Sequence, residues 1–382
     1  MKKSLLGIIF ITILILSSCA LQEAPASDKI IEEPGDEDIE AEEANPARAV
    51  IAGGSGHSLA VMEDGSLWEW GDNNLTPVKI MDDVCFVSAG EHHSFAVKTD
   101  DSLWGFGKNK QILTDGDWRR KPDDSEPIKI MNEVSSVSSG RAHALAVKSD
   151  GSLWAWGNNA FGQLGDGTTV DKASPVKIMV DVACAAAGDM HSLAVKNDGS
   201  LWAWGDNTFG QLGDGTNEDV LRPIKIAEGV ASVSAAAFHS LAVKADGTLW
   251  AWGFSSQNGP ENEAITNGEK IKEPVMIMTY VAYAIAGDDF NFAIKTDGSL
   301  WAWGANYYGR LGNGAAAIVN DPVEIMEDVN SIAAGSNHAL AVRTDGSLWA
   351  WGWNHWGQLG DGTILYSKTP IKIMDGIKTW QQ

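Results

Sequence analysis

Apolar and polar positions follow one pattern along most of the chain, seen best in residues 143–157. Residues 143–147 read H-A-L-A-V and are largely apolar on both faces of an extended strand. Residues 153–157 read L-W-A-W-G, with two indoles on one face and leucine and alanine on the other. Strands that are apolar on both faces lie between other sheets, so the pattern predicts stacked β-sheets.

This pattern recurs seven times, and the first tryptophans of the copies are 36, 50, 48, 48, 51 and 48 residues apart. Such a period is typical of solenoids and propellers, because one unit cannot bury its own apolar faces. We expect an all-β fold, a seven-bladed β-propeller of four-stranded antiparallel blades. The predicted units within residues 48–382 are 48–81, 84–131, 134–179, 182–227, 230–278, 281–326 and 329–374, with a closing segment 375–382. Which terminus supplies the ring-closing strand stays open.

An Asp-Gly pair, Asp150 and Gly151 in the third unit, joins the two apolar strands. It is a strong hairpin signal, and we expect a two-residue type I′ turn in which both residues have positive φ. Thirteen of the fourteen paired aromatic positions that follow these turns are Trp, and one is Phe106. We expect the Trp face of one blade to pack on the small Ala side chains of its neighbour, where a buried indole removes roughly 150–250 Å² from water.

The last strand of each unit, residues 175–179 in the third, is predicted to be the outermost. Charge in the middle of an exposed edge strand discourages pairing with other chains. Six of the seven units carry such a charge, at Lys79, Lys129, Lys177, Lys225, Glu324 and Lys372.

The N-terminus has the pattern of an export signal. Lys2 and Lys3 precede an apolar run, 5–16, which is too short to span a bilayer, and L-S-S-C follows at 16–19. Residues 16–19 resemble the bacterial lipobox, which implies cleavage before Cys19 and attachment of lipid to it. We therefore expect a signal peptide over 1–18 and an extracytoplasmic protein of the bacterial cell envelope, lipid-anchored to a membrane.

Residues 19–47 are predicted to be an acidic, disordered tether. They hold ten Asp and Glu, one Lys, three Pro and no aromatic residue, and so cannot bury enough apolar surface to fold. Of the net charge of −23, the tether contributes −9 and Lys2 and Lys3 contribute +2, which leaves −16 on the repeats. This acidic body argues against a nucleic-acid partner, because nucleic-acid recognition requires a basic surface.

A histidine recurs seven residues before the turn aspartate, and Phe290 stands at this position in the sixth unit. A ring of imidazoles could bind metal or relay protons, but these residues share a strand face with Leu and Val. We therefore expect them to be hydrogen-bonded core groups. The histidines are His57, His93, His143, His191, His239 and His338.

Other candidate chemistry is weak. The G-D-G-T segments at 165–171 and 213–219 suggest calcium, yet neither follows the EF-hand pattern, and turn formation explains them better. Cys85 and Cys184 lie two repeats apart at different offsets, which favours small core residues over a disulfide. The chain has no nucleophile elbow, Walker loop, dinucleotide fingerprint or HExxH. We predict that it is not an enzyme and uses no cofactor or metal.

Three motifs together, A-G-x-x-H-S-L-A-V, D-G-S-L-W-A-W-G and G-x-N-x-x-G-Q-L-G-D-G-T, resemble the repeats of the regulator of chromosome condensation family. The resemblance covers about residues 48–374 and implies a seven-bladed β-propeller. The Q-L-G loop is intact at 157–168, 205–216 and 352–363, altered at 304–314 by Arg310, and unrecognisable in units 1, 2 and 5. Asp101 replaces the turn glycine in unit 2.

The leading functional hypothesis is a non-catalytic, monomeric propeller that binds an unidentified protein partner. The resemblance also allows an inhibitor of a secreted or periplasmic enzyme, because it extends to a propeller-type β-lactamase inhibitor. Guanine-nucleotide exchange, the family's eukaryotic activity, ranks lower because an exported chain does not meet cytoplasmic GTPases. Glycan binding or hydrolysis would need an exposed aromatic platform, and hydrolysis also catalytic acids.

The partner is expected on the face formed by the turns before each repeat histidine and the loops after each Trp pair. In an antiparallel blade both connections emerge on one side, and the Asp-Gly turns emerge on the other. The Asp-Gly side is nearly uniform, whereas the opposite side varies, as recognition loops do. The predicted partner-binding residues are His92, Trp118, Arg119, Arg120, Arg141, Met190, Phe238, Asp288, Trp353 and His355.

Overall fold

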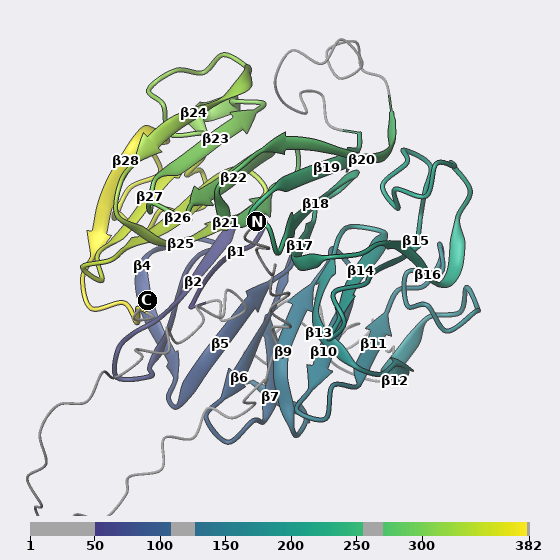
Figure 1. Ribbon diagram of the computed structural model, residues 1–382. Helices are drawn as coiled ribbons and strands as arrows, with labels where there is room; N and C mark the ends of the chain where they lie inside the picture. Colours follow the sequence, from purple (N-terminus) through teal and green to yellow (C-terminus); the bar gives the residue numbers. More distant parts are fainter. Residues whose placement is uncertain (1–49, 108–126, 255–269, 380–382) are drawn as a thin grey trace, which may run out of the picture.

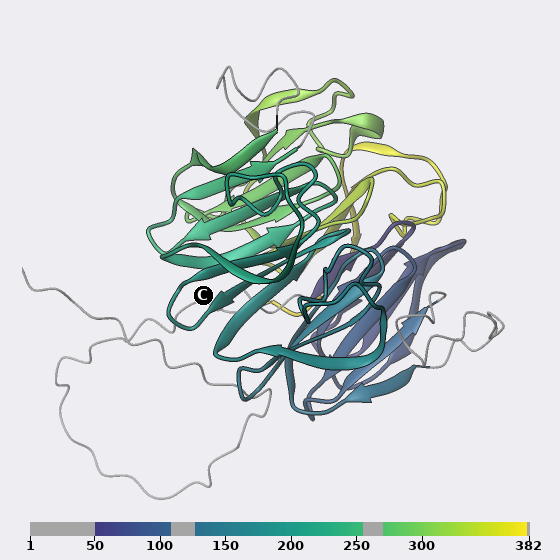
Figure 2. The ribbon, with the colours of Figure 1, turned by 90° about the vertical axis from the view of Figure 1, so that its right-hand side faces the viewer.

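Each predicted unit folds into one antiparallel sheet whose strands are ordered as in the chain. The computed structural model describes residues 50–107, 127–254 and 270–379. These residues form seven four-stranded sheets around a ring (Figure 1). Figure 2, turned by 90°, shows neighbouring sheets as layers packed on one another. The structure confirms the all-β, seven-bladed propeller.

The four strands of each blade run from the centre of the ring to its rim, and blades are numbered here in chain order. The innermost strands, which contact one another around the ring, are β1 (Ile51–Gly53), β5 (Val84–Ala89), β9 (Val134–Ser139), β13 (Val182–Ala187), β17 (Val230–Ala235), β21 (Val281–Ala286) and β25 (Val329–Ala334). The second strands are β2 (His57–Val61), β6 (His93–Lys98), β10 (His143–Lys148), β14 (His191–Lys196), β18 (His239–Lys244), β22 (Phe290–Lys295) and β26 (His338–Arg343).

The two outer strands complete each blade. The third strands are β3 (Leu67–Gly71), β7 (Leu103–Gly107), β11 (Leu153–Gly157), β15 (Leu201–Gly205), β19 (Leu249–Gly253), β23 (Leu300–Gly304) and β27 (Leu348–Gly352). The outermost strands are β4 (Asn74–Met81), β8 (Ile128–Met131), β12 (Lys172–Met179), β16 (Val220–Ala227), β20 (Ile271–Met278), β24 (Val319–Met326) and β28 (Ser367–Met374).

Most of these outermost strands begin earlier than the sequence predicts. In blade 3, β12 begins at Lys172 rather than at Pro175, and Gly157 of β11 pairs with Lys172. A bulge separates this pair from the pair of Ala155 with Val176. Pro175, which lacks an N–H, lies in this irregular stretch, and regular pairing resumes on its other side.

The Asp-Gly turn differs from the expected type I′ turn. Gly151 has a φ of 74°, but Asp150 is not among the residues with positive φ. The N–H of Gly151 donates to the carbonyl of Lys148, and the Asp150 carboxylate accepts bonds from the N–H and hydroxyl of Ser152. This is a three-residue loop that ends in a left-handed glycine, so the type I′ prediction is wrong. In blade 2, Asp101 adopts this conformation with a φ of 59°.

The two indoles of each blade have different surroundings. Trp204 is fully buried and packs on Leu145, Ala155 and Leu164 of blade 3, which confirms the packing of tryptophan on a neighbour's alanine. Trp202 is only half-buried, and the Lys196 ammonium lies 5.3 Å from its ring centroid. Only the second indole of the pair is therefore a full core residue.

Both ends of the described chain close the ring. The N-terminal side supplies β1, which pairs with β2. The C-terminal side supplies Ile377, which bridges Met62 at the end of β2 and donates its N–H to Gly346 of blade 7. In the next blade Val84 makes the equivalent bond to Gly65. The innermost strand of blade 1 is therefore shared, which answers the question that the sequence leaves open, and Figure 1 shows blade 7 in yellow beside blade 1 in purple.

Helical structure is minor in the described residues. One 3₁₀ turn, η1 (Tyr307–Gly309), follows β23. Within the described ranges no helix has the length and apolar character needed to cross a membrane.

Candidate functional site

The connections of each blade emerge on two faces, and backbone hydrogen bonds identify which connections share a face. The N–H of Asn158, in the loop after β11, donates to Ala142, in the turn before β10. On the other side, the N–H of Val84, at the start of a new blade, donates to Gly65 of an Asp-Gly turn. We call the first the loop face and the second the turn face.

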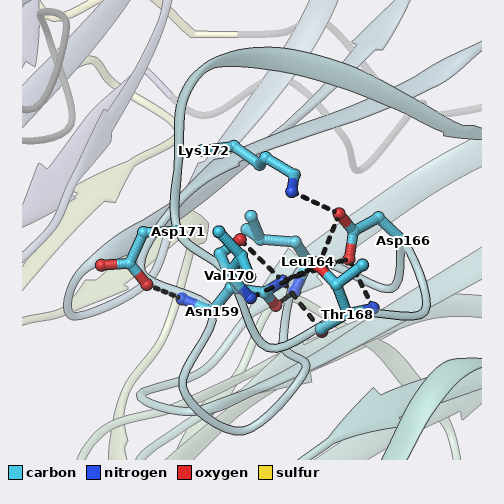
Figure 3. Close-up of polar contacts among 7 residues, drawn as sticks. All are labelled: Asn159, Leu164, Asp166, Thr168, Val170, Asp171 and Lys172. Carbon is cyan, nitrogen blue, oxygen red and sulfur yellow. Dashed lines mark hydrogen bonds and ion pairs between the residues drawn. The ribbon is translucent and has the colours of Figure 1, made fainter.

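Each intact Q-L-G loop is built around one buried asparagine, Asn159 in blade 3 (Figure 3). Its amide nitrogen donates to Asp166 and to the carbonyls of Thr168 and Val170, and its side-chain oxygen accepts the N–H of Leu164. One side chain therefore satisfies backbone groups along the whole loop.

The calcium candidate lies in this loop, and its carboxylate already has several donors. Asp166 accepts hydrogen bonds from the N–H and hydroxyl of Thr168, and the Lys172 ammonium lies 3.0 Å from its Oδ2 (Figure 3). Although burial opposes it, these donors lower the pKa of Asp166 to about 2. Over the described residues, no group of three or more His, Cys, Asp or Glu is arranged to hold a metal ion. The segment is built as a turn.

The base of each intact loop connects two blades. The carbonyl of Gln163, in the loop of blade 3, accepts the Ser192 hydroxyl and the Trp204 indole N–H of blade 4, both at 2.8 Å. The Ser192 hydroxyl in turn lies 2.9 Å from Nε2 of His143 in blade 3. Because Ser192 donates its proton to Gln163, it accepts from His143. We call this set of four groups the latch.

The repeat histidines are thus core groups of the ring, as the sequence predicts. Burial lowers the pKa of His143, His191 and His338 to about 3, so these imidazoles are neutral at physiological pH. The His–Ser bond also closes the ring, because Ser58 of blade 1 lies 2.8 Å from His338 of blade 7.

Three blade pairs lack the serine, and they differ in how they compensate. Blade 6 has Asn291 at this position, and its side-chain oxygen accepts a 2.7 Å bond from Nε2 of His239 in blade 5. Blade 7 has Ala339 at the serine position, and the facing residue of blade 6 is Phe290, which needs no partner. Blade 3 has Ala144 there, yet blade 2 keeps His93. Both ring nitrogens of His93 are buried without a hydrogen-bond partner.

In the part of the chain that the structure describes, several exposed aromatic side chains gather on the loop face of blades 6 and 7. A continuous series of rings connects Tyr366, Tyr308, Trp353, His355 and Trp356, with successive centroids 6.2, 5.8, 6.0 and 5.2 Å apart. Tyr308 is 50% exposed, Tyr366 52% and Trp356 41%. We call these five residues the aromatic strip.

An open hollow of about 490 Å³ adjoins the strip and is lined by Tyr307, Tyr308, Ala316 and Asn337. Arg310 lies behind it, fully buried, where its guanidinium donates to Asn337 and stacks 4.8 Å from the Phe290 ring centroid. Arg310 and Phe290, two of the departures of unit 6 from the repeat, are therefore in contact with each other.

The centre of the loop face is acidic. Arg141 pairs with Glu91 at 3.0 Å and lies 4.0 Å from Asp189. Burial and, to a lesser extent, the neighbouring Asp189 carboxylate raise the pKa of Asp288 to about 7, against the opposing effect of Arg310. Burial likewise raises the pKa of Asp189.

The structure separates the predicted partner-binding residues into groups. Trp353 and His355 lie together in the strip, and Arg141 and Asp288 belong to the acidic centre. His92, exposed, lies 3.8 Å from Glu91. Met190 is half-buried on the turn next to Asp189. Trp118, Arg119, Arg120 and Cys19 lie outside the described residues.

Phe238 belongs to a different sector. Its ring packs 4.8 Å from Phe209, which also contacts Phe254 and lies under the Lys270 ammonium. The structure thus does not place Phe238 with Trp353 in one aromatic surface.

Sequence analysis missed Tyr308, Trp356 and Tyr366. A signal for the first two was present, because the loop reads N-x-aromatic-G in units 3, 4, 6 and 7, with Phe161, Phe209, Tyr308 and Trp356 before the glycine. Tyr366 had no such signal, since only the fold brings the start of β28 beside η1.

Comparison with known proteins identifies a family and solved structures with the same fold. The family model described as RCC1-like domain matches residues 31–258 and 180–381. A crystal structure of human WBSCR16 is 24% identical, covers 79% of this chain and 84% of its own, and has a TM-score of 0.69. Prp20p from Saccharomyces cerevisiae, described with its binding to Gsp1p and histones, is 22% identical, covers 76% and 81%, and has a TM-score of 0.67. These identities support likeness of fold alone. No protein of curated function matches the sequence.

Proposed function

Because this chain belongs to the family of RCC1-like domains, we propose that it is a non-catalytic, monomeric β-propeller that binds a protein partner with its loop face. The aromatic strip carries this proposal. Tyr and Trp are enriched where proteins recognise one another, and five adjoining rings on one sector exceed the scattered apolar groups of an ordinary surface. The binding of Gsp1p and histones described for Prp20p agrees with this use of the fold.

The test is affinity capture with purified protein from extracts of the bacterial cell envelope. We expect a defined partner on the wild-type protein and its loss on the double variant Tyr308→Ala, Trp353→Ala. Asp198→Asn, on the turn face, is the matched control and should retain the partner. Equal capture by all three proteins, with all three folded by circular dichroism, would remove the loop face from consideration.

The identity of the captured protein separates the two forms of this function. If it is a secreted or periplasmic enzyme, such as a β-lactamase, its activity is measured with increasing amounts of the propeller. Stoichiometric inhibition that the strip variant lacks would support an inhibitor. Binding without inhibition would support a recognition module.

We also propose that the propeller acts outside the cytoplasm, with lipid on Cys19 and residues 19–47 as a tether. The support is the sequence: the basic start, the apolar run of 5–16 and the L-S-S-C at 16–19. Stable anchoring requires two acyl chains or a second signal. Mass spectrometry of the mature protein should find a lipid adduct on Cys19, and Cys19→Ala should move the protein to the soluble fraction. Mature protein that retains residues 1–18 would contradict this proposal.

A further inference from the structure

In most blades the half-exposed tryptophan ring lies under a lysine ammonium group, whereas the rings of the aromatic strip do not lie under a cation of the described chain. In five of the seven blades a lysine of the second strand lies over the first tryptophan, with ammonium-to-centroid distances between 3.9 and 5.8 Å. Among the described residues no cation lies over any of the five rings of the strip. Arg310 is directed to Phe290 and Tyr307 instead. Trp353 is stacked between ring neighbours, but Tyr308, Tyr366 and Trp356 are each about half exposed, so the strip offers ring surface to a cation from outside.

The strip is held in place at some conformational cost. Tyr308, which contacts both Trp353 and Tyr366, has a φ of 60° and a ψ of 13°. A left-handed conformation is unfavourable for a bulky residue, and such strain is concentrated at functional sites. The equivalent residues Phe161, Phe209 and Trp356 have no positive φ. This backbone conformation is therefore specific to the ring at the middle of the strip.

Electrostatics on the same face favours a positive partner. The repeats carry −16 of the net charge. At the centre of the loop face, Glu91, Asp189 and Asp289, together with the partly protonated Asp288, outnumber the guanidinium groups of Arg141 and Arg310. Arg310 is near enough to lower the pKa of Asp288, and it donates a hydrogen bond to Asn337, which lines the hollow beside the strip. A cation approaching the strip is thus attracted by an excess of negative charge beside it.

We propose that the aromatic strip docks a protein segment bearing lysine or arginine, whose cationic groups lie over Tyr308 and Trp353 while further positive charge faces Asp189 and Asp288. This inference rests on the proposed function and adds the chemistry of the partner. An uncharged apolar segment or a sugar ring, which could also contact aromatic rings, would not need the charge.

The probe is a short acetylated and amidated Gly-Arg-Gly-Arg-Gly peptide, followed by the indole N–H signals of ¹⁵N-labelled protein. Its match is the same peptide with citrulline, which keeps the shape of arginine without the charge. We expect the Trp353 signal to move with the arginine peptide and the affinity to be at least fivefold lower for citrulline, the size of a cation–π contact of about 1 kcal/mol. Addition of 0.5 M NaCl should weaken the binding of the arginine peptide to the protein.

The variants separate the ring face from apolar area. Tyr308→Leu with Trp353→Leu keeps apolar side chains but removes the π faces, and should lower the arginine affinity about fivefold or more. Trp202→Leu, whose ring already has Lys196 over it, is the control and should leave the affinity unchanged. Equal binding of arginine and citrulline peptides, or unchanged binding by the strip variant, would overturn the proposal.

The outcome is distinguishable from failure of the proposed function. Suppose that an envelope protein is captured only when the strip is intact, while neutral substitutions of its basic contact residues leave binding unchanged. That result would support the proposed protein-binding function and would contradict recognition of a cationic segment. If a glycan probe such as a peptidoglycan fragment moves the Trp353 signal instead, the protein segment is the wrong occupant.

Discussion

The two ends of each blade are held by bonds of different range. At the turn face, Asp150 accepts the Ser152 hydroxyl, and Ser152 accepts the Trp154 indole N–H, so five consecutive residues form a closed unit. At the loop face, the latch joins Gln163 of one blade to Ser192 and Trp204 of the next. The side-chain bonds of the turn stay within one blade, and a backbone bond such as that from Val84 to Gly65 reaches the next blade, whereas the latch joins side chains of neighbouring blades.

This difference explains where the repeats stay uniform and where they vary. The side-chain bonds of each turn are self-contained, and the Asp–Ser–Trp or Asp–Thr–Trp bonds are present in all seven blades. At the loop face, two of the changes in one blade are matched by a change in its neighbour, although His93 opposite Ala144 is not matched in this way. Unit 1 lacks the Q-L-G loop, and the next blade carries Phe106, which has no N–H to donate. Phe290 likewise faces Ala339.

The largest expected effect contrasts the two indoles of one strand. Trp204→Ala should lower the free energy of unfolding by about 3–5 kcal/mol, because it opens a cavity between blades. Trp202→Ala should lower it by only about 1–2 kcal/mol, because that ring is half-buried and held by its own turn. Urea denaturation of both variants measures the difference. Equal losses would show that the two ends of the blade are equally coupled to the ring.

The next effect concerns Asp288 on the loop face. Its pKa of about 7 lies above the value of about 4 in the unfolded chain, so the folded protein holds a proton that the unfolded chain releases. Wild-type stability from this group is therefore present below pH 4 and lost as pH rises to 7. Asp288→Asn should raise the free energy of unfolding by about 1–2 kcal/mol relative to wild type at pH 8, and by little at pH 4. The expected gain is smaller than the full pKa shift implies because the side chain is partly exposed to solvent. Thermal unfolding at both pH values is the measurement. A gain independent of pH would mean that the carboxyl titrates normally.

The smallest expected effect compares two histidines at one repeat position. His191→Phe removes the 2.8 Å bond to Ser240 and should cost about 1 kcal/mol. His93→Phe removes an imidazole whose nitrogens are unpaired and should stabilise by about 1 kcal/mol, because Phe290 shows that the position accepts phenylalanine opposite alanine. Ala144→Ser, which offers His93 a hydroxyl, is the complementary control. Destabilisation by both phenylalanine variants would show that His93 has a partner in solution.

Much of the fold was predictable because its repeat is local. The seven units, the strand order and an apolar indole face follow from periods of two and about forty-eight residues, but the half-exposure of the first indole does not. The predicted type I′ turn was wrong because the Asp150 side chain bonds to Ser152 and keeps its own backbone out of the left-handed region. Of the candidate site, the sequence indicated the face and also Trp353 and His355, but it joined Phe238 to them.

What the sequence by itself determined is therefore the blade, since the contacts that define it lie within one repeat and leave a periodic pattern. Tertiary structure alone decided how the two ends share the closing strand, where Ile377 completes the strand begun by β1. It also decided the aromatic strip, whose residues 308, 353, 355, 356 and 366 come from two units. Contacts between loops of neighbouring blades depend on how the ring places them, and no period in the chain records that placement.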